Sequence, residues 1–347
     1  ILLLKDITGM VEPQPTKERE MLIQSGRHYC EMLPVEYVPT KQYMRVYQEA
    51  LQMYAAPTAE ATACLAQKIV RNRGKKTVLV SLARAGIPIG ILLKRYLKQY
   101  FQLELPHYAI SIIRGRGIDK NAMRYLLDRY EPQQLLFVDG WIGKGAILKE
   151  LQKETAAYSG VSPEIAVLAD PAHVTDLCGT HEDLLIPSSC LNCTVSGLIS
   201  RTFLRSDIIR EDDFHGAVYY GELAASDLSY AFIHEIESRF PKTDHLAPDK
   251  HTDNDVCKTG ETGAEEAEAI AKALQIADIH FIKPGIGETT RVLLRRVPWK
   301  VLVDVRWKDD PALRHIYRLA QEKHVPVEDY PLRHYKCCGI IKKMGDI

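Results

Sequence analysis

The stretch 134–155 constrains the fold more than any other part of this chain. An apolar run at 135–138, bounded by polar residues, predicts a strand buried on both faces, and Asp139 closes it. Three glycines come next: Gly140, Gly143 and Gly145. A helical pattern then begins at Ala146. Free N–H groups at a helix N-terminus bind anions, and an acid at the end of a parallel strand binds sugar hydroxyls. The stretch therefore predicts a site for phosphate and ribose.

This stretch resembles the signature with which type I phosphoribosyltransferases bind 5-phosphoribosyl 1-diphosphate (PRPP). That signature has four apolar residues, two acids, two apolar residues and a loop rich in threonine and glycine. Gly140 takes the place of the second acid here, and Lys144 and Ile147 stand where threonine is usual. The resemblance implies that Asp139 holds the ribose hydroxyls. It implies a 5′-phosphate loop made of Gly140, Gly143, Lys144, Gly145 and Ala146.

A second strand with a glycine-containing loop precedes this stretch. Residues 77–82 form an apolar run, and a helical pattern begins at Pro88, where proline suits the first turn. The loop between them consists of Leu82, Ala83, Arg84, Ala85 and Gly86. The same family resemblance implies that this loop grips pyrophosphate, with Arg84 as its charge and as a catalytic residue beside Asp139. An ordinary strand-to-helix turn is the alternative.

A third predicted strand, at 108–113, ends in a glycine-rich loop that contains Arg114 and Arg116. Guanidinium groups bind phosphate oxygens bidentately, so this loop is a candidate lid over a diphosphate, and a solvated basic loop is the alternative. Strands and helices alternate from residue 77 onward, with a further strand at 164–168. The alternation predicts a mostly parallel sheet with helices on both faces, an α/β fold like that of the type I phosphoribosyltransferases.

Polar residues beyond that last strand are candidates for contact with an acceptor molecule. Asp170 and His173 follow the strand directly, at the sheet edge where open α/β folds bind ligands. Hydroxyl and amide groups suited to a nucleoside-like ligand follow at Ser188, Ser189 and Asn192.

The cysteines in this region have three interpretations. A zinc pattern is formed by Cys178, His181, Cys190 and Cys193, but the gap between its halves is short, so zinc is not expected. Buried structural thiols are the simpler interpretation. Cys190, ahead of a helix predicted at 195–204, is also a candidate nucleophile, because a helix N-terminus favours the thiolate; His181 and His215 are its candidate bases.

The predicted order of segments is an N-terminal tail and helical element at 1–75, the parallel-sheet domain at 76–243, a linker at 244–262 and a second domain at 263–347. The helical pattern at 43–72 is expected to break at Pro57. This helical element is interpreted as a hood over the sheet domain or as plain helical packing. A helix predicted at 224–240 closes the first domain. The linker is rich in charge and poor in large apolar residues.

The second domain is predicted to be a compact α/β sandwich. Strands are expected at 279–282 and 300–305, and helices at 288–296 and 311–324. From residue 279 to the end there are fourteen Lys and Arg against eight Asp and Glu, which indicates an anionic partner.

Residues 283–291 resemble the first RNA-contact segment of the L7Ae/L30e/Pelota superfamily, a lysine–glycine turn, an acid and two threonines that open a helix. Residues 301–311 resemble its second strand and loop. The resemblance implies RNA contact through Lys283, Gly285, Gly287, Glu288, Thr289, Arg291 and Arg295. Gly287 stands where kink-turn-binding members have asparagine. A protein-contact or allosteric module is the alternative.

Composition places the chain among ordinary globular proteins. Its 347 residues suffice for two domains, with 46% apolar and 26% charged residues. No apolar run approaches the roughly eighteen residues of a membrane span, and residues 1–4 are too short for a signal sequence. Eight cysteines are too sparse for a disulfide framework, so the cytoplasm is the expected compartment, with no membrane partner.

The two resemblances together, carried by 186–197 and 283–296, identify the chain as similar to two-domain bacterial proteins of tellurium-resistance (ter) stress operons, often labelled the cysteine protease StiP family. The resemblance implies PRPP-dependent phosphoribosyl transfer to, or release from, a base or nucleoside-like acceptor, with Mg²⁺ bound alongside PRPP and RNA bound by the second domain. A non-catalytic regulator that binds nucleotide and RNA is one alternative, because Gly140 replaces an acid. A cysteine hydrolase that uses Cys190 is another. The acceptor and a homo-oligomeric state stay open.

Overall fold

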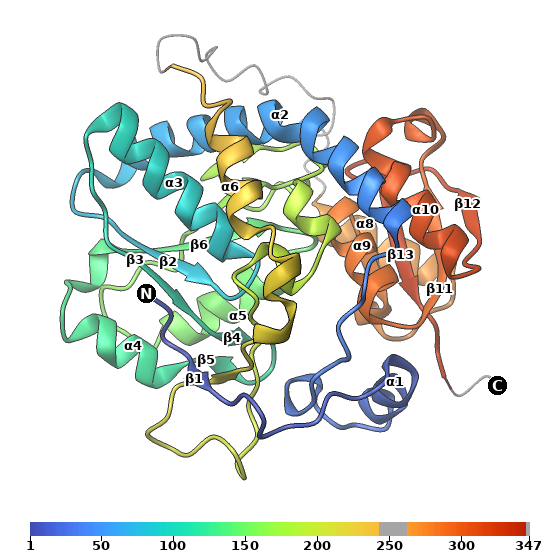
Figure 1. Ribbon diagram of the computed structural model, residues 1–347, viewed down its shortest axis with the longest axis horizontal. Helices are drawn as coiled ribbons and strands as arrows, with labels where there is room; N and C mark the ends of the chain where they lie inside the picture. Colours follow the sequence, from blue (N-terminus) through green and yellow to red (C-terminus); the bar gives the residue numbers. More distant parts are fainter. Residues whose placement is uncertain (243–261, 345–347) are drawn as a thin grey trace.

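The computed structural model describes residues 1–242 and 262–344, which form two α/β units side by side (Figure 1). The larger unit is built on a five-stranded sheet of parallel strands in the order β3-β2-β6-β7-β8. The strands are His107–Ile110 (β3), Val78–Leu82 (β2), Leu135–Trp141 (β6), Ile165–Ala169 (β7) and Cys178–Thr180 (β8). The predicted parallel sheet is thereby confirmed.

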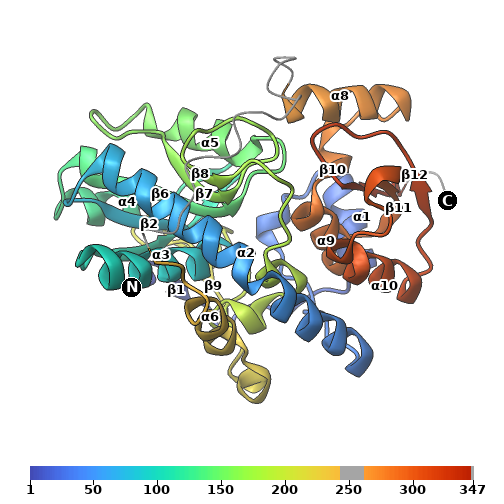
Figure 2. The same ribbon diagram turned by 90° about the horizontal axis from the view of Figure 1, so that it is seen from above.

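Helices cover both faces of this sheet (Figure 2). Lys41–Arg73 (α2), Gly86–Phe101 (α3) and Ser229–Glu237 (α6) pack on one face, and Lys120–Leu127 (α4) and Ala146–Thr155 (α5) on the other. Alternate residues of β6 enter the two apolar clusters: Leu136 packs under α2 and α3, whereas Phe137 packs under α4 and α5. The strands are apolar throughout because neither face meets water.

The long helix α2 is continuous, so the predicted break at Pro57 is wrong. A proline inside a helix removes one hydrogen bond and costs about 3 kcal/mol. Ala55 and Ala59, on either side of the proline, are both fully buried in the apolar cluster of the sheet. Packing on both sides therefore keeps the helix intact, and the Thr58 hydroxyl donates to the carbonyl of Tyr54 at 2.7 Å.

The smaller unit is also α/β, as predicted. Its four-stranded mixed sheet has the order β10-β13-β11-β12, with strands Ile282–Pro284, Cys337–Ile341, Pro298–Val303 and Val327–Asp329. Its helices are Gly263–Ala273 (α8), Ile286–Arg295 (α9) and Arg314–Glu322 (α10). The helix α8 was not predicted, although Thr262 and Glu265 form a capping box at its start.

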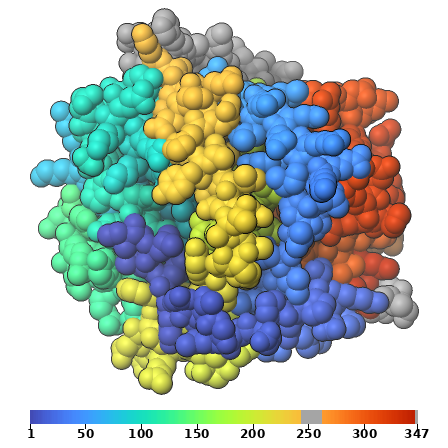
Figure 3. All heavy atoms as spheres, viewed as in Figure 1, coloured from blue at the N-terminus to red at the C-terminus, as the bar shows by residue number. Residues whose placement is uncertain are grey.

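The N-terminal residues join the two units. The strand β1 (Lys5–Asp6) pairs with β9 (Gly216–Ala217), and α1 (Thr16–Gln24) continues toward the smaller unit, where Gln24 donates to the carbonyl of Lys342 at 2.9 Å. Figure 3 shows this segment, in dark blue, running along the lower edge of the molecule. The first turns of α2 also share an apolar cluster with α9 and α10.

Three further predictions concern single segments of the chain. The helix predicted at 195–204 is wrong: the 3₁₀-helices Pro187–Cys190 and Cys193–Val195 stand nearby, and left-handed backbone at Gly197 and Leu198 stops helix growth. The helix predicted at 224–240 is confined to α6, after a 3₁₀-helix at Gly221–Ser226. The predicted linker lies, apart from Thr262, outside the described residues.

None of the described helices combines the length and apolarity that a membrane crossing needs.

Candidate active site

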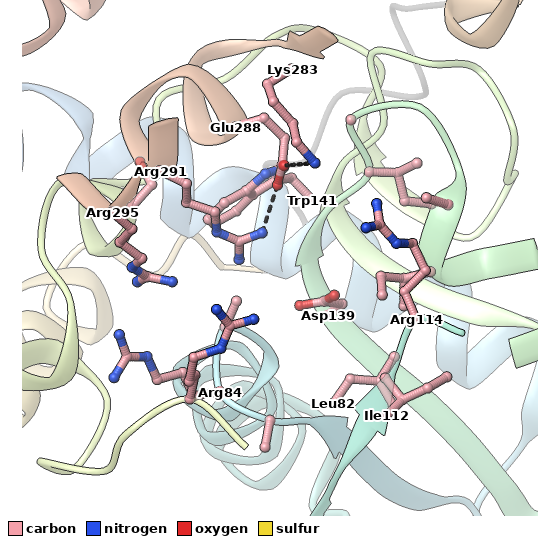
Figure 4. A pocket seen from close by; sticks show the side chains of 18 of the residues that line it. Leu82, Arg84, Ile112, Arg114, Asp139, Trp141, Lys283, Glu288, Arg291 and Arg295 are labelled. Carbon is pink, nitrogen blue, oxygen red and sulfur yellow. Dashed lines mark hydrogen bonds and ion pairs between the residues drawn. The ribbon is translucent and has the colours of Figure 1, made fainter. Parts of the chain in front are cut away.

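A pocket of about 310 Å³ lies between the carboxyl ends of the sheet strands and the smaller unit (Figure 4). Two acidic side chains of the described residues line it, Asp139 and Glu288. The basic residues that line it are Arg19, Arg84, Arg114, Lys144, Arg201, Lys283, Arg291, Arg295 and Arg296. The pocket is therefore strongly cationic and suits a polyanionic ligand.

Asp139 lies in the pocket, with Arg114 on one side and Arg84 on the other (Figure 4). It ends the buried part of β6, and the N–H of Gly140 donates to its Oδ1 at 2.8 Å. Burial raises the pKa of the Asp139 carboxyl to about 6, although the charge of Arg291 opposes this shift. The carboxyl group is therefore mostly ionised at pH 7 and becomes protonated as the pH falls through 6.

The predicted phosphate loop lies beside Asp139. Gly143, Lys144, Gly145 and Ala146 all line the pocket, and Gly145, with φ of 79°, turns the chain into α5. The Lys144 ammonium donates to the carbonyls of Ile279 and Ile282 in the smaller unit, and burial lowers its pKa to about 8. The N–H groups at the start of α5 are the part of this loop that suits a phosphate.

The predicted pyrophosphate loop also reaches the pocket, through Leu82, Ala83, Arg84 and Ala85. The peptide bond between Ala83 and Arg84 is cis. Arg84 donates to Glu36 at 3.2 Å and to the carbonyl of Ile199 at 2.5 Å.

Two glycines lie behind these loops. A Cβ on Gly86 would collide with the carbonyl oxygen of Val138, the residue before Asp139. Gly140 does not line the pocket either, and its side-chain position faces Ala85 at 3.6 Å. The close approach at Gly86 brings the loop after β2 and Asp139 to one pocket.

One of the two predicted lid arginines reaches the pocket. The loop lies between β4 (Ile112–Ile113) and β5 (Gly117–Ile118), and its Arg114 lines the pocket, with Nη1 at 3.0 Å from Nδ1 of His280. Arg116 does not line it and pairs with Glu31 at 2.7 Å, so its role over a diphosphate stays a prediction.

The predicted acceptor residues divide into two groups. Ser188, Ser189 and Asn192 line the pocket, and the buried hydroxyl of Ser189 has no hydrogen-bond partner among the described residues. Asp170 and His173 do not line it, so nothing in this pocket supports their predicted contact with an acceptor. The fully buried Asp170 shapes the turn after β7 instead, by accepting from the N–H groups of residues 174 and 175 at 2.7 and 2.8 Å.

His181 belongs to a Cys–His–Asp group that the sequence analysis missed. Its Nε2 lies 3.4 Å from the sulfur of Cys178, and its Nδ1 lies 3.7 Å from a carboxylate oxygen of Asp170. His173 stacks on the same imidazole, with ring centroids 4.4 Å apart. These are the residue types of a cysteine hydrolase, but Cys178 is fully buried and does not line the pocket.

The structure removes the basis for Cys190 as a nucleophile. It lies in a 3₁₀-helix rather than before an α-helix, its side chain is fully buried, and burial raises the pKa of its thiol to about 12. His215, the second candidate base for Cys190, has its Nδ1 2.8 Å from the hydroxyl oxygen of Ser111. Cys190 and Cys193 enter different apolar clusters, and the described residues contain no group of three or more His, Cys, Asp or Glu arranged for a metal.

The segment predicted to contact RNA faces the larger unit. Lys283, Glu288, Arg291 and Arg295 line the pocket. Arg291 pairs with Glu288 at 2.6 Å, and Lys283 lies 4.0 Å from its other oxygen. Burial opposes the charge of Glu288, but the positive charges of Arg291 and Lys283 outweigh it and lower the pKa to about 2.

The rest of that segment lies behind the pocket. Gly287 packs so closely on the indole of Trp141 that a Cβ would overlap the ring, and Arg291 stacks on the same ring at 4.3 Å. Gly285 donates to the carbonyl of Cys337 at 2.8 Å, and Thr289 is fully buried. Trp141 therefore leaves no room for the asparagine usual at Gly287.

Three lining arginines were not predicted: Arg19, Arg201 and Arg296. They come from α1, from the stretch after the second 3₁₀-helix, and from the residue after α9. No periodicity or sequence motif marks these three arginines as a set, because what they share is that the fold brings them to one pocket. Arg19 is 1% exposed although it belongs to a short helix of mostly polar residues.

Comparisons with known proteins agree with the two-part architecture. Residues 1–237 match the family described as tellurite-like stress resistance cysteine protease StiP, and residues 261–343 match the PELOTA RNA binding domain. A curated protein named cysteine protease StiP, from Acinetobacter baylyi (strain ATCC 33305 / BD413 / ADP1), is 34% identical over 348 residues, which cover 96% of this chain and 90% of that protein.

Two of the solved structures with weaker likeness are phosphoribosyltransferases. A hypoxanthine-guanine phosphoribosyltransferase from Bacillus anthracis is 15% identical, with a TM-score of 0.25 over 42% of this chain and 80% of that chain. A hypoxanthine-guanine-xanthine phosphoribosyltransferase is 17% identical, with a TM-score of 0.22 over 38% of this chain and 74% of that chain. TM-scores of this size decide nothing about activity. The match over residues 1–237 and the identity along nearly the whole length show that the chain belongs to the family described as tellurite-like stress resistance cysteine protease StiP.

Proposed function

We propose that this protein transfers a phosphoribosyl group from PRPP to a base or nucleoside-like acceptor, or catalyses the reverse release. The observation that carries the proposal is the meeting of Asp139, the glycine loop before α5 and the loop that contains Arg84 in one cationic pocket. These groups suit the ribose hydroxyls, the 5′-phosphate and the pyrophosphate of PRPP in turn. Because PRPP is an intracellular metabolite, the proposal places the protein in the cytoplasm.

The proposed chemistry is a displacement at the anomeric carbon of the ribose. The bond from that carbon to the pyrophosphate oxygen breaks, the oxygen keeps the electron pair, and the acceptor forms the new bond. The sugar gains positive charge in the transition state, which the Asp139 carboxylate stabilises, while Arg84 and Arg114 stabilise the departing pyrophosphate.

Asp139 also fits the Mg²⁺ that PRPP chemistry requires. Of the two acids that line the described pocket, Glu288 is engaged by Arg291 and Lys283, and Asp139 has no ion-pair partner among the described residues. Mg²⁺ is commonly held by one or two carboxylates together with substrate phosphates. When bound, it would neutralise charge on the pyrophosphate.

Isothermal titration with PRPP and Mg²⁺ tests the proposal directly. We expect micromolar affinity, and release of pyrophosphate once an acceptor is supplied. Absence of PRPP binding by the folded protein would overturn the transferase assignment. Binding without any pyrophosphate release across a panel of bases and nucleosides would instead favour the regulator, in which Gly140 replaces the acid needed for turnover.

The affinity for PRPP is expected to fall as the pH drops through 6. The ionised Asp139 binds the ligand, and burial places its pKa at about 6 in the empty pocket. At pH 5 about one tenth of the carboxyl groups are ionised, so the affinity should be about tenfold lower than at pH 7. Inorganic pyrophosphate, which has no ribose, serves as the control ligand. An identical pH dependence for both ligands would contradict a role of Asp139 at the ribose.

The family name requires a test of cysteine chemistry as well. We expect Cys178→Ala and Cys190→Ala to bind PRPP within about twofold of the wild type, because neither side chain lines the pocket and both are fully buried. Thermal unfolding confirms that each variant is folded. Cleavage of denatured casein by the wild type that disappears in Cys178→Ala would establish a hydrolase built on Cys178 and His181.

RNA is the proposed partner of the smaller unit, and the match to the PELOTA RNA binding domain supports it. Lys283 and Arg291 of its first RNA-type segment line the pocket, so RNA contacts through these two residues would compete with a small ligand there. Filter binding of RNA with and without PRPP measures that competition.

A further inference from the structure

Four arginines of the pocket have no ion-pair partner among the described residues. One is Arg114, which lies near Asp139 (Figure 4). The other three are Arg19, Arg201 and Arg295. They come from α1, from the stretch that precedes β9 and from the end of α9, so all three parts of the chain contribute. Arg19 donates from Nη2 to the backbone carbonyl of Arg295 at 2.7 Å, which places these two residues side by side. The guanidinium of Arg201 lies 4.4 Å from the ring centroid of Tyr29, which also lines the pocket.

The neighbouring acids are already engaged. Glu36 accepts from Arg84 at 3.2 Å, and Glu20 binds Arg296 through two contacts of 2.5 and 2.8 Å. Burial, followed by the charges of neighbouring arginines, lowers the pKa of Arg19 and of Arg295. A buried charge without a counter-ion is costly, so this arrangement favours a bound anion.

Unpaired donors show where that anion would lie. Nε and Nη1 of Arg19 are buried without a hydrogen-bond partner among the described residues, and so is Nε of Arg201. Arg19 is 1% exposed, so bulk water does not satisfy its donors. Beside them, Asn192 accepts from Nε of Arg295 at 2.6 Å, and the hydroxyl of Ser189 is likewise buried and unpaired.

The three arginines exceed what PRPP requires. Its 5′-phosphate has the N–H groups before α5, and its pyrophosphate has the loop of Arg84. Figure 4 shows Arg295 on the side of the pocket away from Arg114 and Asp139. The acceptor-side residue Asn192 accepts a hydrogen bond from Arg295, and Ser189 lines the same pocket. The extra charge therefore lies where the second substrate would enter.

We propose that Arg19, Arg201 and Arg295 form a second anion subsite, which binds a phosphate group of the acceptor, so that the acceptor is a phosphorylated small molecule such as a nucleotide and not a free base. This inference rests on the proposed function, since it names the class of the second substrate. It also gives the smaller unit a part in catalysis, because Arg295 reaches the pocket only when that unit is docked.

The test uses the full chain and two ligand series. Isothermal titration measures PRPP with Mg²⁺, and then the four ribonucleoside 5′-monophosphates, their nucleosides and inorganic phosphate on PRPP-loaded protein. The variant is Arg201→Gln, and the control is Arg205→Gln, which lies outside the pocket and removes an exposed pair with Asp207. Thermal unfolding of the empty protein is the second measurement.

We expect at least one monophosphate to bind PRPP-loaded protein about tenfold or more tightly than its nucleoside. Arg201→Gln should remove that advantage, change PRPP affinity less than about threefold and raise the thermal midpoint of the empty protein, because it removes a cation with no ion-pair partner whose Nε is buried and unpaired among the described residues. Arg205→Gln should do none of these. Saturable binding of inorganic phosphate that depends on Arg201, with no preference among monophosphates, would still place a phosphate group in this subsite.

Two results would overturn the inference: monophosphates and phosphate that bind only in competition with PRPP, or an Arg201→Gln variant that loses PRPP affinity by the same factor. Failure of the proposed function gives a different pattern. In that case PRPP does not bind, while Arg201-dependent binding of monophosphates persists.

Discussion

The variant Asp139→Asn should lose PRPP binding while it keeps the fold. Loss of the carboxylate removes charge-assisted contacts with the ribose hydroxyls and Mg²⁺, which should cost about 2–5 kcal/mol, or at least about 30-fold in affinity. The asparagine oxygen can accept the Gly140 N–H that Asp139 accepts at 2.8 Å. Burial disfavours the charged carboxylate, so a neutral amide should leave the free energy of unfolding unchanged or slightly higher. Isothermal titration with PRPP and Mg²⁺ measures the loss.

The matched control is Asp207→Asn, an exposed carboxylate that pairs with Arg205 at 2.6 Å. Because this pair is exposed to solvent, its loss should leave both PRPP affinity and stability essentially unchanged. Equal PRPP affinity in the wild type and Asp139→Asn would show that the ribose does not lie at the end of β6, and the transferase mechanism would then have no carboxylate at its centre.

A methyl group at Gly86 is expected to damage both stability and ligand binding. The new Cβ would overlap the carbonyl oxygen of Val138 and lie 3.1 Å from its carbon and 3.2 Å from Cα of Asp139. These are backbone atoms of β6, so no side chain can rotate away. Overpacking of this kind costs about 3 kcal/mol, and urea unfolding of Gly86→Ala measures it. PRPP affinity should fall more than about tenfold, because the two loops that meet the ligand are forced apart.

Gly140→Ala is the control from the same pocket region. The nearest atom to its new Cβ is the carbonyl oxygen of Ala85 at 3.6 Å, an ordinary van der Waals distance, and its φ is not positive. We expect a change in stability below about 1 kcal/mol. A Gly86→Ala variant as stable as Gly140→Ala would mean that α3 can shift away from β6 without loss.

Several elements could be predicted because their causes are local. The apolar run of β6, the glycines after it and the helix start at Ala146 are neighbours in sequence, and the structure has them as predicted. The loop of Arg84 follows from the same reasoning applied to β2 and α3. Prediction failed where a local pattern was outweighed, as at Pro57, where packing on both sides of the proline holds α2 together.

The region of Cys190 shows a different limit. Its apolar spacing suggested a helix at 195–204, but the hydroxyl of Ser196 bonds to the carbonyl of Asn192 at 3.2 Å, and left-handed backbone follows at Gly197. Side-chain bonds of this kind compete with helix formation. The wrong helix also produced the wrong environment for Cys190, since burial rather than a helix N-terminus determines the pKa of its thiol.

By itself, the sequence determined the parallel sheet, the anion-binding turn before α5 and the presence of a second α/β unit, because each depends on contacts within a few residues or on the periodicity of one element. Only the tertiary structure decided which charges share a pocket. Arg19, Arg201 and Arg295 are separated by most of the chain, yet they meet there because the N-terminal helix and the smaller unit both dock on the larger one. The electrostatic potential of a pocket sums over side chains that are near in space, and spacing along the chain does not record that nearness.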